Sequence, residues 1–338
     1  MNLREEIIDA MDGHRHGLPP PAIFTQTGTV EQMNACGRFW PEANFDTEGM
    51  TELALQPSIL MGFATARIPY SITVEAHALG CGINPGTKES QPVLTSSPYR
   101  TGGDIAPVPE LKDISEFLSD DWIQSIVSSC KELTKHEGLF VTAAMIGPLG
   151  LVNYLAGFEE VAMAMCMEPE KITEWVSKIT PYQEAYASLL SENCDNVMII
   201  EEADCNLLPP DFFGPLIGDY LPKVISEARK DSYCTIHSCG DTFPVADRLS
   251  ALGEDCLSAE ASSDRLEYVR LAGKNCRLLG AINPVQTLLS GTPEDILKSA
   301  RQSVDAGFDL IGPECGVPPQ TRNENLLALS HYREHLSH

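Results

Sequence analysis

Leu278-Leu279-Gly280-Ala281-Ile282 is a continuous apolar run, and Val197-Met198-Ile199-Ile200 is a second run of the same kind. Neither run alternates apolar and polar residues, as a strand with one solvated face does. Strands that are buried on both faces, as in a parallel sheet, show this continuous pattern. The two stretches therefore predict a parallel sheet in the interior of an α/β protein.

The chain contains eight short strand-like runs, each followed by a segment that can form a helix or a loop. The predicted strands are Ala22–Thr27, Ile68–Val74, Leu139–Ile146, Asn196–Glu201, Tyr233–His237, Cys256–Ala261, Arg277–Ile282 and Asp309–Gly312. Regular alternation of eight strands with helices favours a closed (β/α)8 TIM barrel over an open doubly wound sheet. No glycine-rich phosphate-binding pattern follows the first run, which weakens a dinucleotide-binding interpretation.

Two segments lie outside this alternation. Leu3–Met11 predicts an N-terminal helical extension. Gly80–Lys112 is too long for an ordinary βα loop, and its prolines and glycine turns predict a surface flap over the barrel mouth, after the second strand. Neither an internal repeat nor a linker is evident. We therefore expect a single catalytic domain over residues 1–338.

The composition restricts the class of protein. A formal net charge of −25 argues against binding to nucleic acid or to an anionic membrane surface. No run of about 18 apolar residues indicates a membrane span, and the acidic start of the chain predicts no secretory signal. The number of cysteines, 11, is odd, and most of them lie in apolar stretches. Free thiols in a reducing cytoplasm are the expectation.

A histidine and two cysteines stand where predicted strands end. His237 and Cys239 close the fifth run, and Cys315 follows the eighth. In a parallel barrel the carboxyl ends of the strands share one rim, so these side chains can converge. Three soft ligands are the number that a catalytic zinc site uses, whereas a structural site more often has Cys-x-x-Cys pairs. A packed histidine beside incidental thiols remains the alternative.

Further polar residues close other predicted strands. We expect Glu260 to be the fourth zinc ligand, or else a carboxylate that orients His237. A substrate pocket is predicted from the polar residues at the other strand ends, which are Glu75, Glu202, Asp204 and Asn283. A purely structural role in a polar pocket or a backbone turn is the alternative for Glu202 and Asp204. His77 is interpreted as structural.

Several stretches resemble the uroporphyrinogen decarboxylase superfamily. They are Pro20-Pro21-Ala22-Ile23-Phe24-Thr25-Gln26-Thr27-Gly28-Thr29, Phe39-Trp40-Pro41-Glu42, Thr73-Val74-Glu75-Ala76, Leu279-Gly280-Ala281-Ile282-Asn283-Pro284, Leu288-Leu289-Ser290-Gly291-Thr292-Pro293-Glu294 and Pro313-Glu314-Cys315-Gly316-Val317-Pro318-Pro319-Gln320-Thr321. Within this superfamily, the set His237, Cys239 and Cys315 resembles the zinc-dependent methylcobamide:coenzyme M methyltransferases.

The resemblance implies a zinc enzyme that moves a methyl group from a methylated corrinoid to a small thiol, coenzyme M. The nucleophile would be the zinc-bound thiolate of the substrate, with no separate protein nucleophile, because coordination deprotonates a thiol whose pKa is otherwise about 8.5. Asp12-Gly13-His14-Arg15-His16-Gly17 matches a cobalt-binding pattern, but no doubly wound domain surrounds it. The corrinoid is therefore expected on a partner corrinoid protein.

Other functions on this fold remain open. A tetrapyrrole decarboxylase would need no metal, but Thr25-Gln26-Thr27-Gly28-Thr29 replaces the arginine-containing signature of those enzymes. A zinc hydrolase could use Glu202 or Asp204 as its base, and a non-catalytic module that binds a corrinoid protein is a further alternative. Glu201-Glu202-Ala203-Asp204-Cys205 departs from the methyltransferase pattern, and no arginine is evident that would bind a sulfonate. The source of the methyl group is not defined.

Overall fold

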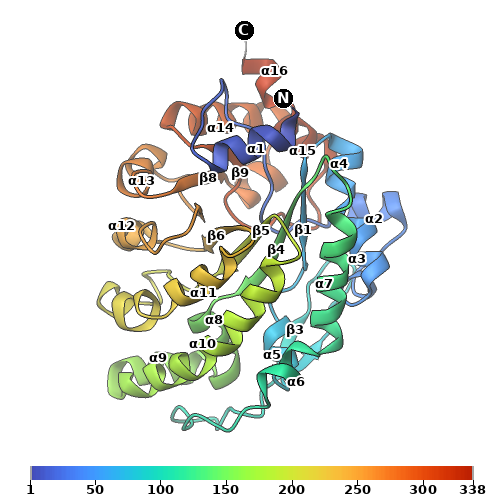
Figure 1. Ribbon diagram of the computed structural model, residues 1–338. Coiled ribbons are helices and arrows are strands. Elements are labelled where there is room, and N and C mark those ends of the chain that lie inside the picture. Colours follow the sequence, from blue (N-terminus) through green and yellow to red (C-terminus); the bar gives the residue numbers. More distant parts are fainter. Residues whose placement is uncertain (1, 337–338) are drawn as a thin grey trace.

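The computed structural model describes residues 2–336. Its centre is a seven-stranded parallel sheet in the order β1-β4-β5-β6-β7-β8-β9, which curls into a barrel-like wall (Figure 1). A separate antiparallel hairpin consists of β2 (Gly82–Asn84) and β3 (Val93–Ser96). The strands of the main sheet are β1 (Thr65–Ile68), β4 (Phe140–Ile146), β5 (Asn196–Ile200), β6 (Tyr233–Ser238), β7 (Cys256–Ala259), β8 (Arg277–Ile282) and β9 (Leu310–Pro313).

Helices cover the outside of this wall. They are α1 (Leu3–Met11), α2 (Val30–Cys36), α3 (Thr47–Ala54), α4 (Gln56–Met61), α5 (Val74–Ala78), α6 (Ile114–Leu118), α7 (Asp121–Leu133), α8 (Pro148–Ala156), α9 (Phe158–Met167), α10 (Pro169–Ser191), α11 (Leu221–Ala228), α12 (Ala246–Leu249), α13 (Arg265–Ala272), α14 (Pro293–Ala306), α15 (Asn323–Ser330) and α16 (Tyr332–Leu336). Short 3-10 or π turns span Glu42–Asn44, Pro210–Phe212, Gly214–Gly218, Phe243–Val245 and Pro284–Leu289. Within residues 2–336 no single helix could cross a membrane by length and apolar composition, and only α8 and α9 taken together, bent by 106°, meet both criteria.

The predicted α/β barrel-like fold is confirmed, and six of its predicted strands correspond to β4–β9 with ends that differ by at most two residues. The first predicted strand, Ala22–Thr27, is instead an extended segment with one parallel bridge, between Pro21 and Ile311. Its preceding prolines lack the N–H groups that a ladder needs.

This segment nevertheless occupies the eighth position. The Ala22 N–H donates to the carbonyl of Ile311 at 2.9 Å, and on the other side the Ile23 N–H donates to Thr65 Oγ1 in β1 at 3.3 Å. A Cβ at Gly312 would lie 2.1 Å from the Ala22 carbonyl oxygen, so only glycine allows this approach. The segment therefore lies between β9 and β1 and closes the wall.

The second predicted strand, Ile68–Val74, was placed too late in the chain. The strand β1 ends at Ile68, and Val74 already begins α5. Pro69 cannot donate to a neighbouring strand, so the ladder stops before it. The β-branched residues that follow had suggested a strand, but tertiary packing overrides that weak preference. Glu75 consequently lies on a helix and not at a strand end.

The predicted N-terminal extension is α1, which packs under the barrel. Its buried residues Ile7, Ala10 and Met11 belong to one apolar cluster with interior side chains of the sheet. Within that cluster the rings of Phe24 and Phe140 stack at 5.3 Å between centroids. In Figure 1, α1 lies at the end of the barrel opposite β3. The apolar face of this helix thus closes one end of the barrel.

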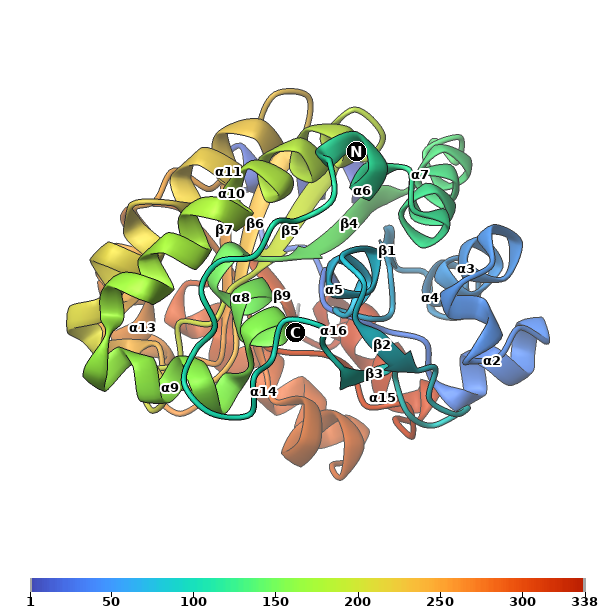
Figure 2. The same ribbon diagram turned by 90° about the horizontal axis from the view of Figure 1, so that it is seen from below.

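The predicted flap covers the other end. It contains the β2–β3 hairpin and then a long irregular stretch that Figure 2 shows crossing in front of the barrel. Two aromatic residues of α10 hold the stretch through its carbonyl groups. Trp175 Nε1 donates to Ala106 at 2.8 Å, and the Tyr182 hydroxyl donates to Lys112 at 2.6 Å. The flap is thus tied down over the barrel mouth.

Candidate metal centre

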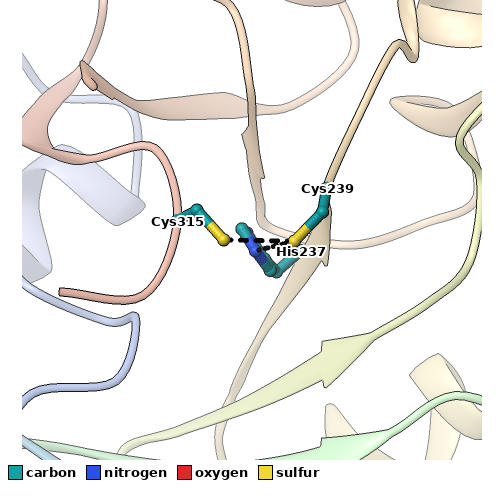
Figure 3. A group of neighbouring side chains, drawn as sticks. All are labelled: His237, Cys239 and Cys315. Carbon is teal, nitrogen blue, oxygen red and sulfur yellow. Dashed lines mark hydrogen bonds between the residues drawn. The ribbon is translucent and has the colours of Figure 1, made fainter. Parts of the chain in front are cut away.

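The structure brings His237, Cys239 and Cys315 together at the barrel mouth. His237 lies in β6, Cys239 directly follows this strand, and Cys315 stands two residues after β9. Figure 3 shows the three side chains pointing toward one another. The two sulfur atoms are 3.1 Å apart, and His237 Nε2 lies 3.3 Å from Cys239 Sγ. One potential ligand atom from each residue lies within 4.8 Å of the other two.

A tight turn directs Cys239 toward this point. Gly240 has φ = +74°, and a Cβ there would lie 2.3 Å from the side chain of Asp204. Asp204 Oδ1 accepts the Asp241 N–H at 3.0 Å and so supports the turn from behind. The position requires glycine, both for its left-handed conformation and for the close approach of the carboxylate.

A buried carboxylate holds the loop of Cys315. Glu314 is 1% exposed and accepts hydrogen bonds from the Ala261 N–H at 3.1 Å and the Ser262 N–H at 2.8 Å. Its second oxygen accepts from the Ser262 hydroxyl at 2.7 Å and from Asn283 Nδ2 at 2.8 Å. The loops that follow β7, β8 and β9 are therefore joined through one side chain, which sets the position of Cys315.

Ser258 orients the imidazole. It faces His237 across the β6–β7 pair, and its Oγ lies 3.1 Å from His237 Nδ1. A ligating imidazole usually makes such a second hydrogen bond, which leaves its other nitrogen free to coordinate. The alternative in which Glu260 orients His237 is wrong for this structure, because the serine of the neighbouring strand occupies that position.

The two thiols share a proton. Their hydrogen bond lowers the pKa of Cys315 to about 4, assisted by a hydrogen bond from His237, and the same bond together with burial raises the pKa of Cys239. The 3.1 Å separation is far longer than a disulfide bond of about 2.05 Å. All 11 cysteines of the chain are free.

The donor set fits a zinc ion. Two sulfur atoms and one imidazole nitrogen are ligands that Zn²⁺ prefers. A Zn–S bond is about 2.3 Å long, so two ligands of one ion lie no more than about 4.6 Å apart. The three donor atoms lie within 4.8 Å of one another, which is close to that distance. Three protein ligands leave a fourth position open, as in catalytic sites.

Glu260 lies beside this group but is not part of it. Its carboxylate is not among the donors that meet within 4.8 Å. It borders an open hollow of about 760 Å³ together with Gly240, Asn283 and Glu314. Burial raises its pKa, whereas a hydrogen bond from the Gly240 backbone and the nearby His237 lower it. Its role as fourth ligand stays a prediction.

The acidic residues after β5 have separate surroundings. Glu201 accepts the N–H groups of Gly150 and Glu202, both at 2.9 Å, and so caps α8. Asp204 supports the Gly240 turn, so its observed contacts are those of a backbone brace. Glu202 borders a hollow of about 550 Å³ with Tyr154 and Phe158, and burial raises its pKa.

The other predicted pocket residues make structural contacts. Glu75 is 1% exposed and accepts the Ile146 N–H at 2.7 Å, and burial raises its pKa to about 8. Asn283 donates to Glu314 and accepts the N–H groups of Val285 and Gln286. The ring of His77 packs against Trp122, as its structural interpretation predicted.

An inner cavity of about 270 Å³ lies beneath the three ligands. Its lining includes two residues that sequence reasoning missed, Arg67 at β1 and Tyr70 just after it. Gln91 of the flap and Ile72 line both this cavity and the larger hollow beside Glu202. In the sequence Arg67 directly precedes the predicted strand Ile68–Val74, and nothing there says which way its side chain points.

Comparisons with known proteins agree with this geometry. The family model described as uroporphyrinogen decarboxylase (URO-D) matches residues 2–336. The chain is 30% identical to the methylcobamide:CoM methyltransferase MtaA of Methanosarcina barkeri, over 97% of this chain and 96% of that protein. It is also 30% identical to the methylcobamide:CoM methyltransferase MtbA of Methanosarcina acetivorans, over 96% and 93%. A solved methyltransferase from Methanosarcina mazei superposes with a TM-score of 0.91 at 28% identity, covering 100% of both chains.

Proposed function

Because this chain belongs to the uroporphyrinogen decarboxylase family, and because its relatives at 30% identity are methylcobamide:CoM methyltransferases, we propose that it is a zinc-dependent methyltransferase. It moves a methyl group from a methylated corrinoid to a small thiol, coenzyme M. Residues His237, Cys239 and Cys315 hold the zinc ion. A partner corrinoid protein presents the corrinoid, and the whole chain acts as one catalytic domain.

The convergence of one imidazole and two thiols at a cavity of the barrel mouth carries this proposal. Donors from β6 and from the loop after β9 meet within 4.8 Å at the mouth. The cavity that they line has a volume of about 270 Å³, the size of a site for a small ligand. A small thiol fits this space.

The residues of the chain have distinct tasks. Zinc bound at this site would hold the sulfur of the substrate as a thiolate at neutral pH. Ser258 fixes the imidazole of His237, and Glu314 fixes the loop of Cys315. We assign Glu260 to the fourth ligand position in the absence of substrate. No protein side chain serves as the nucleophile.

The methyl donor approaches from the outer hollow. This hollow, about 550 Å³, lies between the flap and α8 and shares Ile72 and Gln91 with the inner cavity. Tyr154 and Phe158 give it an apolar wall. In this proposal the acceptor thiol occupies the inner cavity, the methyl donor is presented from the outer hollow, and the two meet at the shared border for an in-line displacement. Glu202 is the acidic residue at this border.

The test combines metal analysis with methyl transfer. The purified protein is expected to contain about one zinc ion per chain with sulfur and nitrogen ligands, measured by elemental analysis and X-ray absorption. It should remove the methyl group of free methylcobalamin only when coenzyme M is added. Cys239→Ala should lose both properties.

Other outcomes would identify other functions. Zinc without transfer to any thiol would contradict the methyltransferase and favour a hydrolase that uses Glu202 as base. A protein with no affinity for zinc would contradict the metal site itself and favour a metal-independent decarboxylase. A location in a reducing cytoplasm, where free thiols persist, remains a prediction from the cysteine content.

A further inference from the structure

Arg67 is a buried cation beside the metal centre. It lies in β1, is 3% exposed, and belongs to the lining of the inner cavity together with His237, Cys239 and Cys315. Burial lowers its pKa to about 10, and it therefore stays protonated at neutral pH. A charge this deep inside a protein is costly unless something compensates it.

The described residues supply little compensation. Arg67 Nη1 donates to the carbonyl of Pro69, but Nε is buried and has no hydrogen-bond acceptor among residues 2–336. No carboxylate within that range lies in ion-pair distance of its guanidinium. By contrast, the half-buried Arg265 donates to Ser262, Ala281, Ser299 and Ser303. Arg67 thus combines deep burial with an unpaired Nε donor at a cavity.

The cavity is otherwise uncharged. Besides the three proposed metal ligands, its lining consists of neutral side chains and backbone, without an aspartate or a glutamate. Apolar residues such as Ile72, Met198 and Ile200 form much of it. In a chain with a net charge of −25, a carboxylate-free cavity around a buried arginine is selective for anions. The guanidinium is planar and suited to two-pronged binding of an oxyanion.

We propose that Arg67 binds the anionic group of the acceptor thiol, a sulfonate or a carboxylate, while the sulfur of the same molecule reaches the site of Cys239 and Cys315. The proposal rests on the function given above and adds the residue that recognises the anionic end of the acceptor, a short thiol with a terminal oxyanion. The cavity of about 270 Å³ has room for a short spacer between the two groups. Arg67 is thus a specificity-determining residue that positions the substrate from one end.

A binding experiment tests this without methyl transfer. Ethanesulfonate and propionate lack the thiol, so they report on the anion subsite alone. The wild-type protein is titrated with each ligand by calorimetry, and the same titrations are made with Arg67→Met. We expect the substitution to weaken binding of the preferred anion about tenfold to a hundredfold. The ratio between the two ligands distinguishes sulfonate from carboxylate.

An activity experiment tests the same subsite through selectivity. Methyl transfer from free methylcobalamin is compared for 2-mercaptoethanesulfonate, 3-mercaptopropionate and the neutral 2-mercaptoethanol. The wild type should prefer an anionic thiol in kcat/KM by about tenfold or more. In Arg67→Met this preference should fall toward one, mostly through KM. Arg67→Lys, which keeps the charge but loses the planar fork, should restore part of it.

Controls separate charge from folding. Arg229→Met removes a positive charge from an ion pair with Asp255, and should keep both anion binding and selectivity. Circular dichroism and zinc content show whether each variant is folded and loaded. A folded, zinc-containing Arg67→Met protein with unchanged anion affinity and unchanged selectivity would overturn the proposal. Anion binding that depends on Arg67 in a protein without methyl transfer would retain the subsite and contradict only the proposed function.

Discussion

Two cysteines at β6, Cys234 and Cys239, have opposite surroundings although they stand only five residues apart. Cys234 lies inside the strand, fully buried, where burial raises the pKa of its thiol well above the usual value. Cys239 lies just past the end of the strand, exposed at the mouth, with an imidazole and a second thiol as neighbours. The same residue type is thus an inert filler in the wall and a ligand at the rim. Position relative to the strand end decides its chemistry.

The largest difference in activity should appear when a rim cysteine and a wall cysteine are each replaced by alanine. Cys315→Ala removes a rim ligand, so the zinc content should fall. The rate of coenzyme M-dependent demethylation of methylcobalamin should fall by about a thousandfold or more. Cys234→Ala, the matched wall variant, should keep zinc and activity and lose only about 1 to 2 kcal/mol of stability. Equal losses of activity in both variants would break the distinction between wall and rim.

Glu75 is a buried carboxyl group on α5, and burial raises its pKa to about 8 from 4.5. A raised pKa means that its neutral form stabilises the fold below about pH 4.5, and that this contribution disappears as the pH rises through about 8. Glu75→Gln cannot ionise. We expect the free energy of unfolding of the variant, minus that of the wild type, to be higher at pH 9 than at pH 4 by roughly 2 to 5 kcal/mol.

Denaturant unfolding at a series of pH values measures this difference. Glu260→Gln serves as the rim counterpart, since Glu260 is only partly buried and should show a smaller pH effect. Parallel stability curves for the wild type and Glu75→Gln would mean that Glu75 ionises freely in the folded protein.

Ser258 tests the support of the rim. Ser258→Ala removes the hydrogen bond to His237 Nδ1 and leaves the three ligands in place. The affinity for zinc should drop about tenfold to a hundredfold, measured by competition with a chelator. Ser250→Ala, a serine whose hydroxyl contacts Asp247 and Asn275 away from the metal centre, is the control. Unchanged affinity would show that the imidazole needs no such partner.

The smallest effect is expected at Glu260. If Glu260 fills the fourth position at rest, Glu260→Gln should alter the resting zinc spectrum in X-ray absorption and change the transfer rate only a few-fold, because the thiol displaces this ligand. The spectrum of the thiol-bound form should be the same in both proteins. An identical resting spectrum would remove Glu260 from the coordination shell.

Much of the fold was readable from local patterns. The continuous apolar runs at 197–200 and 278–282 became β5 and β8 because residues buried on both faces leave a simple signature. The helix α14 begins after a capping box at Thr292 and is capped by Gly307 at its C-terminal end, and both residue types are local helix-boundary signals. The two strands nearest the start of the chain were less accurate, because prolines at 19–21 and at 69 interrupt hydrogen bonding that apolar content alone suggests.

The amino-acid sequence by itself determined the ligand types and their placement at strand ends. In an extended chain His237 and Cys239, two residues apart, point to the same side, and both follow from local geometry. The sequence linked Cys315 to these two residues only because the strand ends of a parallel barrel share one rim, and because of the family resemblance. What the tertiary structure decided was every contact that depends on register or on closure: Ser258 opposite His237, Glu314 between three loops, and Arg67 inside the cavity. Such contacts join residues that are distant in sequence. Arg67, for example, is a buried cation and not a surface charge only because β1 packs against its neighbours.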